Sequence, residues 1–260
     1  MSTTARGTWL SKRRLESLLD TLDVVPPLEA LTLSLTPGVS LESVHLVEPQ
    51  HIQWLDEIQS FASDRLAASE TGAVVFWSDS LQLLVIPPFP MAQSSQSTGL
   101  DTSPLRALMQ REFTLGVVLL RLGRYSVGVF KGDVLLTSKT DTRYVKGRHS
   151  AGGTSQRRFA RIRQKQIYEL FVKACSVAEE KLGPYEKEID HIFLGGERHT
   201  LTDFLKECPF LQRMESRVAR RILSVGEPRR RELENMPREI WKSQVTPFKL
   251  PEGFPFQGLG

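Results

Sequence analysis

The chain has 260 residues, enough for one large or two modest domains, with 40% apolar and 25% charged residues. This balance is typical of a globular protein with an ordinary core, and the formal net charge is only +4. The sequence contains no run of about 20 apolar residues, which excludes a membrane-spanning helix. Its first residues lack the apolar core of a secretion signal, so we expect a cytoplasmic protein.

The two cysteines, Cys175 and Cys208, have neither a CxxC spacing nor a cluster of histidines around them. We therefore expect no disulfide framework and no zinc site, as in a reducing compartment. The five histidines are scattered without an HExxH-like spacing. The sequence predicts no cofactor and no protein-bound metal.

The first 90 residues alternate between helical and strand patterns, which predicts a small α/β unit over 1–90 without a catalytic constellation. The predicted elements are a helix over 9–22, a strand over 30–35, a helix over 51–68 and a hairpin of strands over 73–77 and 81–86. The second helix is expected to bury Ile52, Leu55, Ile58, Phe61 and Leu66.

The next stretch is rich in Pro, Ser, Gln and Gly and predicts a linker or mobile loop over 91–108.

From 109 to 245 a second α/β domain is expected, followed by a Pro/Gly-rich tail over 246–260. The predicted elements of this domain are a meander of strands over 114–120, 124–130 and 132–138, a helix over 155–182, a strand over 191–196, a helix over 200–206, a strand over 217–225 and a helix over 229–243. The long helix should present Phe159, Ile162, Leu170, Ala174 and Val177 to the core. A meander followed by strands with intervening helices predicts a mixed sheet with flanking helices.

A glycine-containing loop directly precedes the most basic helix of the chain, in the segment GRHSAGGTSQRRFARIR over 147–163. Between Val145 and Tyr168 there are seven Lys or Arg residues and no Asp or Glu. Gly152 and Gly153 allow the backbone to adopt positive φ and to approach a ligand closely. Ser155 is well placed to cap the helix, whose start carries partial positive charge. The interpretation that competes with a ligand site is an ordinary loop before a solvated helix.

The basic side chains are spaced to form a phosphate-binding face. Arg157, Arg161 and Lys165 recur every four residues and therefore share one side of the helix. His149 beside the loop could act as a base or bind phosphate, although a lone loop histidine is more often simply solvated. The loop does not match GxxxxGK[ST] or GxGxxG, which disfavours a mononucleotide site. We expect nucleic acid as the partner, and the residues expected to bind it are Lys146, Arg148, His149, Arg157, Arg158, Arg161, Arg163 and Lys165.

The segment GGTSQRRFARIR resembles the catalytic loop of the eukaryotic and archaeal class-one peptide release factors. In that family a Gly-Gly-Gln enters the peptidyl transferase centre and is followed by a basic helix start. The resemblance spans roughly residues 114–241, and Thr154 stands where those factors have glutamine. Gln156 follows two places later, which is typical of the Vms-like release-factor family, bacterial type. The loop residues that match position by position are Gly152, Gly153, Ser155, Arg158, Phe159, Ala160, Arg161, Ile162 and Arg163.

This resemblance implies a release-factor catalytic domain with an RNase H-like α/β fold, next to the smaller N-terminal α/β unit. It implies a peptidyl-tRNA hydrolase that acts on stalled large ribosomal subunits, with Gln156, Gly152 and Gly153 as catalytic residues. The implied partners are the large subunit, its ribosomal RNA and peptidyl-tRNA, and we expect a monomer. Glutamine cannot serve as a general base, but it can position water while its backbone N–H stabilises an oxyanion.

Three alternatives remain open at this point. The loop could cut the tRNA just before its CCA end, with Arg148, Arg157 or Arg161 stabilising the charge on the reacting phosphorus. The chain could instead be a non-enzymatic RNA-binding module with an inert loop. A metal-dependent nuclease on an RNase H-like sheet is a weaker reading, because it needs clustered carboxylates and the candidates are Asp133, Asp141 and Asp190.

Overall fold

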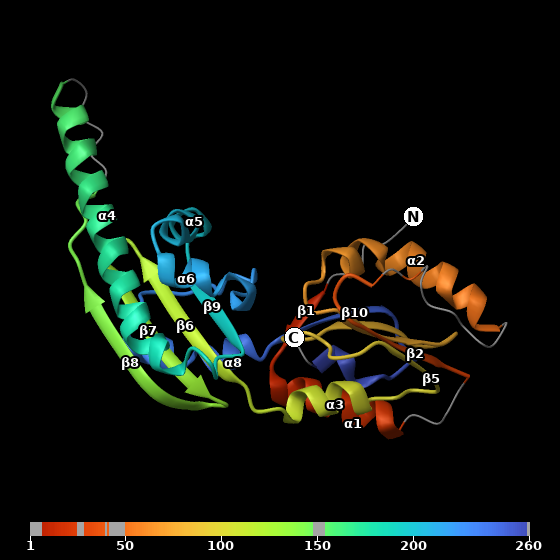
Figure 1. The fold of residues 1–260 in the computed structure, drawn as a ribbon. Coiled ribbons are helices and arrows are strands. Elements are labelled where there is room, and N and C mark those ends of the chain that lie inside the picture. Colours follow the sequence, from red (N-terminus) through yellow and green to blue (C-terminus); the bar gives the residue numbers. More distant parts are fainter. Residues whose placement is uncertain (1–6, 25–28, 40, 42–49, 148–153, 259–260) are drawn as a thin grey trace. The chain divides into compact units, whose positions relative to one another are not determined.

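The computed structural model describes residues 7–24, 29–39, 41, 50–147 and 154–258, and the chain divides into two units. The first unit comprises residues 1–111 together with 241–260, and the second comprises residues 112–240 (Figure 1). Residues 241–260 thus belong to the N-terminal unit, which is not the smaller of the two as predicted. Within the described ranges, no helix combines the length and the apolar character needed to cross a bilayer.

The first unit is built on an antiparallel sheet with the strand order β1-β10-β4-β3-β2-β5. The hairpin of β3 and β4 and the strand β2 confirm the predicted elements of this region. The strands are β1 (Thr8–Leu10), β2 (Leu31–Leu35), β3 (Ala73–Trp77), β4 (Gln82–Ile86), β5 (Ser95–Thr98) and β10 (Ser243–Lys249).

Helices cover both faces of this sheet, with α2 on one side and α1 and α3 on the other (Figure 1). Their bounds are Lys12–Val24 for α1, Gln50–Ala68 for α2 and Ser103–Gln110 for α3. The leucine spacing of the first predicted helix is confirmed, because α1 buries Leu15, Leu18, Leu19 and Leu22.

The predicted buried stripe of α2 is wrong in part. Ile52 and Phe61 are 56% and 45% exposed, whereas Trp54, Ile58 and Ala62 are buried against β2 and β3. The indole N–H of Trp54 donates to Asp79 Oδ1 at 3.2 Å, which satisfies the polar atom of this large buried ring. The helix is therefore rotated from the predicted orientation.

The predicted linker over 91–108 and the predicted tail over 246–260 are wrong where they include regular structure. β5 pairs with β2, and α3 is held to α1 by Arg106, whose guanidinium lies 2.8 Å from Asp20 and 2.6 Å from Asp23. Strand β10 lies between β1 and β4 in the sheet. Strands β5 and β10 are rich in polar residues and are held by backbone pairing, so an apolar pattern does not reveal them.

The second unit confirms the predicted mixed sheet with flanking helices. Its strand order is β8-β7-β6-β9, in which β6, β7 and β8 form the predicted antiparallel meander and β9 runs parallel to β6. The strands are β6 (Thr114–Arg121), β7 (Arg124–Lys131), β8 (Val134–Thr142) and β9 (His191–Gly196). The helices are α4 (Thr154–Leu182), α5 (Arg198–Lys206), α6 (Pro209–Arg213), α7 (Arg230–Glu234) and α8 (Met236–Ile240).

The segment after α6 differs from the predicted strand over 217–225. A 3-10 turn at Glu215–Arg217 leads into two isolated parallel bridges to β9, at Val218 and at Leu223. The predicted helix over 229–243 is divided into α7 and α8, because Pro237 has no N–H to continue the first helix.

Arg221 lies between the two bridges and connects this segment to the end of α8. It is half-buried and donates to the carbonyl oxygens of Glu239 and Ile240, and burial lowers its pKa.

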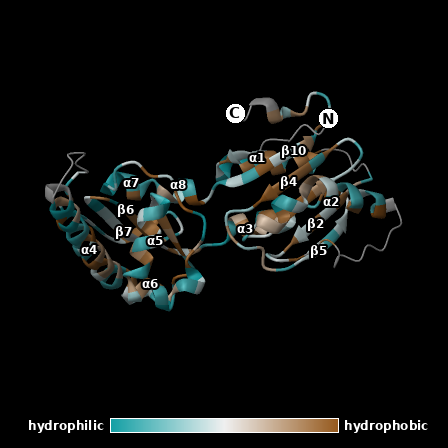
Figure 2. Ribbon diagram, turned by 90° about the horizontal axis from the view of Figure 1, so that it is seen from above, coloured by the Kyte–Doolittle hydropathy of each residue, from teal (hydrophilic) through white to brown (hydrophobic). Residues whose placement is uncertain are grey.

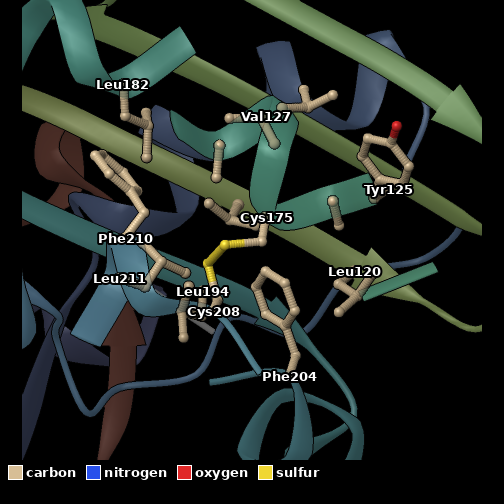
Figure 3. Close-up of a cluster of buried hydrophobic side chains, with 14 of the residues drawn as sticks. Leu120, Tyr125, Val127, Cys175, Leu182, Leu194, Phe204, Cys208, Phe210 and Leu211 are labelled. Atoms are coloured by element: carbon tan, nitrogen blue, oxygen red, sulfur yellow. A yellow bond between two sulfur atoms is a disulfide. The ribbon is translucent and has the colours of Figure 1, made fainter. Parts of the chain in front are cut away.

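A disulfide joins Cys175 to Cys208, with 5.3 Å between the two Cα atoms, so the expectation of no disulfide is wrong (Figure 3). Cys175 lies on α4, and Cys208 lies just before α6, 33 residues away in the sequence. Both are buried in the core of the second unit, among Leu194, Phe204, Phe210 and Leu211. Their pairing follows from the packing of α4 against α6, which no local spacing of cysteines indicates.

Candidate nucleic-acid interface

Helix α4 has two halves with different surroundings. From Leu170 to Leu182 the helix packs on the sheet, with Leu170, Ala174 and Val177 buried as predicted. Between 157 and 169 no side chain is buried, and Ile162 from the predicted stripe is 39% exposed. Figure 1 shows this first half extending beyond the helices and the strand ends of its unit. The sequence therefore places its basic residues on a helical projection that has no core of its own.

The chain that leads into the glycine loop is fastened to this projection. Gln166 Oε1 accepts a hydrogen bond from the backbone N–H of Lys146 at 3.0 Å. The Nε of Arg163 donates to the carbonyl oxygen of Lys146, also at 3.0 Å. The ammonium group of Lys146 lies 4.0 Å from the ring centroid of Phe159, in a cation–π contact. Lys146 is thus held at its backbone and at its side chain by three residues of α4.

A second attachment lies one turn further along the helix. Arg143 follows strand β8, and its guanidinium donates to Glu169 Oε2 at 2.7 Å. This hydrogen bond lowers the pKa of Glu169, whose carboxylate therefore stays ionised over a wider pH range. The backbone N–H of Arg143 donates to the carbonyl oxygen of Gly123 in the turn between β6 and β7. The two attachments hold residues 143–146 against α4.

Four predicted RNA-binding residues of α4 face solvent: Arg157, Arg158, Arg161 and Lys165. No described residue forms a hydrogen bond or an ion pair with the three guanidinium groups of this set. The first turn of α4 contains no acidic residue, so the partial positive charge of the helix start adds to these cations. In Figure 2 the start of α4 is coloured as hydrophilic, and brown appears toward the packed half. This surface suits phosphate oxygens, which guanidinium groups bind through paired donors.

The structure describes the side chains of some of the other predicted site residues, while the rest lie outside the described residues. Arg163 and Lys146 are half-buried and take part in the attachment of the loop, in addition to any contact with RNA. Gln156 lies in the first turn of α4, but its side chain and those of Thr154 and Ser155 are outside the described residues, so the capping role of Ser155 stays a prediction. Arg148, His149, Gly152 and Gly153 also lie outside the described residues.

The carboxylates required for a nuclease are not brought together. Asp133 precedes β8 and Asp141 lies near its far end, while Asp190 Oδ2 accepts a hydrogen bond from the backbone N–H of Thr114 beside β9. In the part of the chain that the structure describes, no three His, Cys, Asp or Glu residues form a group that could hold a metal ion.

Sequence reasoning did not assign the residues that attach the loop. Arg143, Gln166 and Glu169 have no motif of their own. The single available signal is that Arg163, Gln166 and Glu169 recur every three residues, which places consecutive members on neighbouring positions of the helix surface.

Comparison with known proteins points to translation factors. A family model described as "Actinobacteria/chloroflexi VLRF1 release factor" matches residues 113–246, about half of the chain. Peptide chain release factor subunit 1 of Archaeoglobus fulgidus is 30% identical over 117 residues, covering 45% of this chain and 29% of that protein. The protein of the same name from Aeropyrum pernix is 27% identical over 201 residues, covering 67% of this chain and 54% of its own length. The chain thus spans only about a third to a half of these relatives.

Two solved structures also resemble the chain. The archaeal translation termination factor aRF1 aligns with 89% of this chain and 73% of its own, at a TM-score of 0.39 and 19% identity. A structure described as the Vms1 mitochondrial localization core aligns with 91% of this chain and 94% of its own, at a TM-score of 0.42 and 14% identity.

Proposed function

This chain belongs to the Actinobacteria/chloroflexi VLRF1 release factor family, and on that basis we propose that it is a peptidyl-tRNA hydrolase. It releases nascent chains from peptidyl-tRNA on stalled large ribosomal subunits, in ribosome-associated quality control. It works in the cytoplasm as a monomer, with ribosomal RNA and peptidyl-tRNA as its contacts. The family match supports this proposal because it includes the glycine loop and the whole of α4.

The chemical task is attack of water on the ester that joins the peptide to a ribose oxygen of the tRNA. The water oxygen bonds to the carbonyl carbon, negative charge develops on the carbonyl oxygen, and the ribose oxygen leaves and takes up a proton. In our proposal Gln156 positions the water and its backbone N–H stabilises the oxyanion. Gly152 and Gly153 let the backbone enter a space that is crowded with RNA.

One structural observation carries the proposal: the chain that leads to the glycine loop is fastened to a cationic projection. Gln166 and Arg163 hold Lys146 two residues before the undescribed segment 148–153, and α4 begins directly after it. The exposed cations on α4 supply contacts to phosphates that would orient the loop.

Substitution of Gln156 tests the proposal. Gln156→Ala keeps the backbone N–H but removes the side chain that positions the water, and it is therefore expected to slow release of nascent chains about 10²-fold. Release is measured under single-turnover conditions on purified large subunits that carry peptidyl-tRNA, and subunit binding is measured by co-sedimentation. Binding should be unchanged, and Gln110→Ala, an exposed glutamine in the other unit, serves as the matched control.

Two results would contradict parts of the proposal. Release at the wild-type rate by Gln156→Ala would remove this residue from the reaction. Binding of the wild-type protein without release would favour a non-enzymatic RNA-binding module. Mass analysis of the released peptide separates hydrolysis of the ester from cleavage of the tRNA, because cleavage before the CCA end leaves three nucleotides on the peptide.

A further inference from the structure

A polar cavity of about 400 Å³ opens beside the cationic half of α4, within the second unit. Arg163, Gln164 and Tyr168 of α4 form one wall. The opposite wall is formed by α5 and the residues at its two ends, including His199, Asp203 and Glu207. Cavities of this size accommodate small organic ligands or parts of larger ones. Nothing in the release chemistry described above uses this cavity.

The cavity continues the line of cations on α4. Arg157, Arg161 and Tyr168 lie on one side of the helix, because steps of four and seven residues return to nearly the same direction. Tyr168 follows Arg161 by two turns, about 10 Å along the helix axis. A strand of RNA whose phosphates contact Arg157 and Arg161 would therefore pass the mouth of the cavity at its next nucleotides.

Tyr168 presents an aromatic surface at this mouth. Its side chain is 52% exposed, although Phe171, which also lines the cavity, is buried in the core of the unit. Exposed aromatic rings next to cationic surfaces are the usual platforms on which single-stranded nucleic acids stack their bases.

The cavity lining combines the cations of Arg163 and Lys206 with three carboxylates, and this excess of acidic groups favours the edge of a base over a phosphate. Asp203 is neutralised by Lys206 at 3.2 Å, and His199 Nδ1 lies 3.2 Å from its other oxygen. Glu197 lies 3.5 Å from the guanidinium of Arg121. The carboxylate of Glu207 has no hydrogen bond or ion pair to a described residue. Carboxylates repel phosphate but accept hydrogen bonds from the exocyclic amino groups of bases.

We propose that this cavity binds an unpaired nucleobase of the RNA that α4 contacts, stacked on Tyr168. The base carries an exocyclic amino group, which donates to Glu207. The proposal rests on the RNA contact in the proposed function, and it adds the position and the chemical class of one bound nucleotide. The base can come from ribosomal RNA or from the single-stranded end of a tRNA, since both offer unpaired nucleotides.

The test uses the full chain and ten-nucleotide single-stranded RNAs, with binding followed by fluorescence anisotropy. Tyr168→Ala is expected to weaken binding about tenfold, whereas Tyr168→Phe, which keeps the ring, binds like the wild type. Val172→Ala is the matched control, because this exposed side chain lies one turn further along α4 and outside the cavity. Circular dichroism shows whether each variant keeps the fold.

An abasic nucleotide moved along the RNA identifies the bound base. One abasic position should weaken binding by the wild-type protein but not by Tyr168→Ala, because the stacking partner is then already missing. Uracil at that position should weaken binding by the wild type but not by Glu207→Gln, since uracil has no exocyclic amino group. A sensitive position within a terminal CCA assigns the base to tRNA, and a sensitive position in an RNA copied from a ribosomal loop assigns it to ribosomal RNA.

Equal binding by Tyr168→Ala and Val172→Ala, or the absence of any sensitive position, would overturn the base site. If Arg161→Ala then still weakens binding, the RNA contact of α4 stands while the cavity is excluded. The release assay with Gln156→Ala is independent of both results, so loss of the base site and loss of the proposed activity are distinguishable.

Discussion

The two halves of α4 share one helix but differ in what holds them. Residues 170–182 bury Leu170, Ala174 and Leu182 and are joined through Cys175 to the start of α6. Residues 157–169 bury no side chain and are stabilised by hydrogen bonds to a loop, of which Arg163 and Gln166 provide two. The packed half contributes to the free energy of unfolding, and the projecting half is free to carry cations that a core would exclude.

This difference separates stability from binding along a single helix. Truncating a buried apolar side chain of the packed half costs about 2–5 kcal/mol, whereas substitution of an exposed side chain rarely changes stability by more than about 0.5 kcal/mol. Substitutions in the projecting half can therefore alter the proposed RNA contacts while the fold remains intact.

Loss of the disulfide is expected to have the largest effect on stability. The disulfide closes a loop of 33 residues and so restricts the unfolded chain. The double variant that combines Cys175→Ala and Cys208→Ala should therefore have a free energy of unfolding that is lower by about 4 kcal/mol. Urea denaturation of the wild type and of the double variant, each with and without reductant, measures this change. Reductant should destabilise only the wild type. Equal stability of the oxidised wild type and the double variant would show that the packed half does not depend on this bond.

Two apolar truncations on α4 compare its halves directly. Leu170→Ala removes a fully buried side chain and is expected to lower the free energy of unfolding by about 3 kcal/mol. Ile162→Ala removes a 39% exposed side chain and should change it by no more than about 0.5 kcal/mol. Thermal or urea unfolding measures both. A similar loss from both variants would contradict the contrast between the halves.

The ion pair of Arg143 with Glu169 predicts a smaller effect that depends on pH. Its hydrogen bond lowers the pKa of Glu169 in the folded state, so the pair stabilises the fold above the usual value of 4.5. This contribution is lost as the pH falls below 4.5 through the lowered pKa. The stability of Arg143→Ala should therefore approach that of the wild type in acid, as followed by urea unfolding between pH 7 and pH 3. A constant difference over this range would exclude Glu169 as the cause.

The sequence predicted the elements with strong apolar periodicity. The leucines of α1, the meander of β6 to β8 and the length of α4 were visible because each buries a regular set of side chains. Strand β5 escaped prediction because its residues are polar and it is held by backbone pairing with β2. Phe61 of α2 packs against Trp77 and against Phe248 of the distant strand β10 while it stays 45% exposed, and helical spacing alone does not predict this position.

The sequence predicted which basic residues belong to the candidate site, but it did not predict how the chain beside them is held. The cations of α4 followed from their spacing, since helical geometry fixes which positions share a side. The attachment of Lys146 by Gln166 and Arg163 did not follow, because it depends on the path of the chain after β8. The disulfide was missed for the same physical reason, as two cysteines on separate elements meet only through tertiary packing.

The position of β10 has a consequence for the order in which the protein folds during synthesis. This strand, near the end of the chain, lies between β1 and β4 in the first unit, while all of residues 112–240 precede it. The second unit can therefore complete its sheet while the ribosome still holds the end of the chain. The first unit, although translation begins with it, keeps open strand edges until residue 249 has emerged.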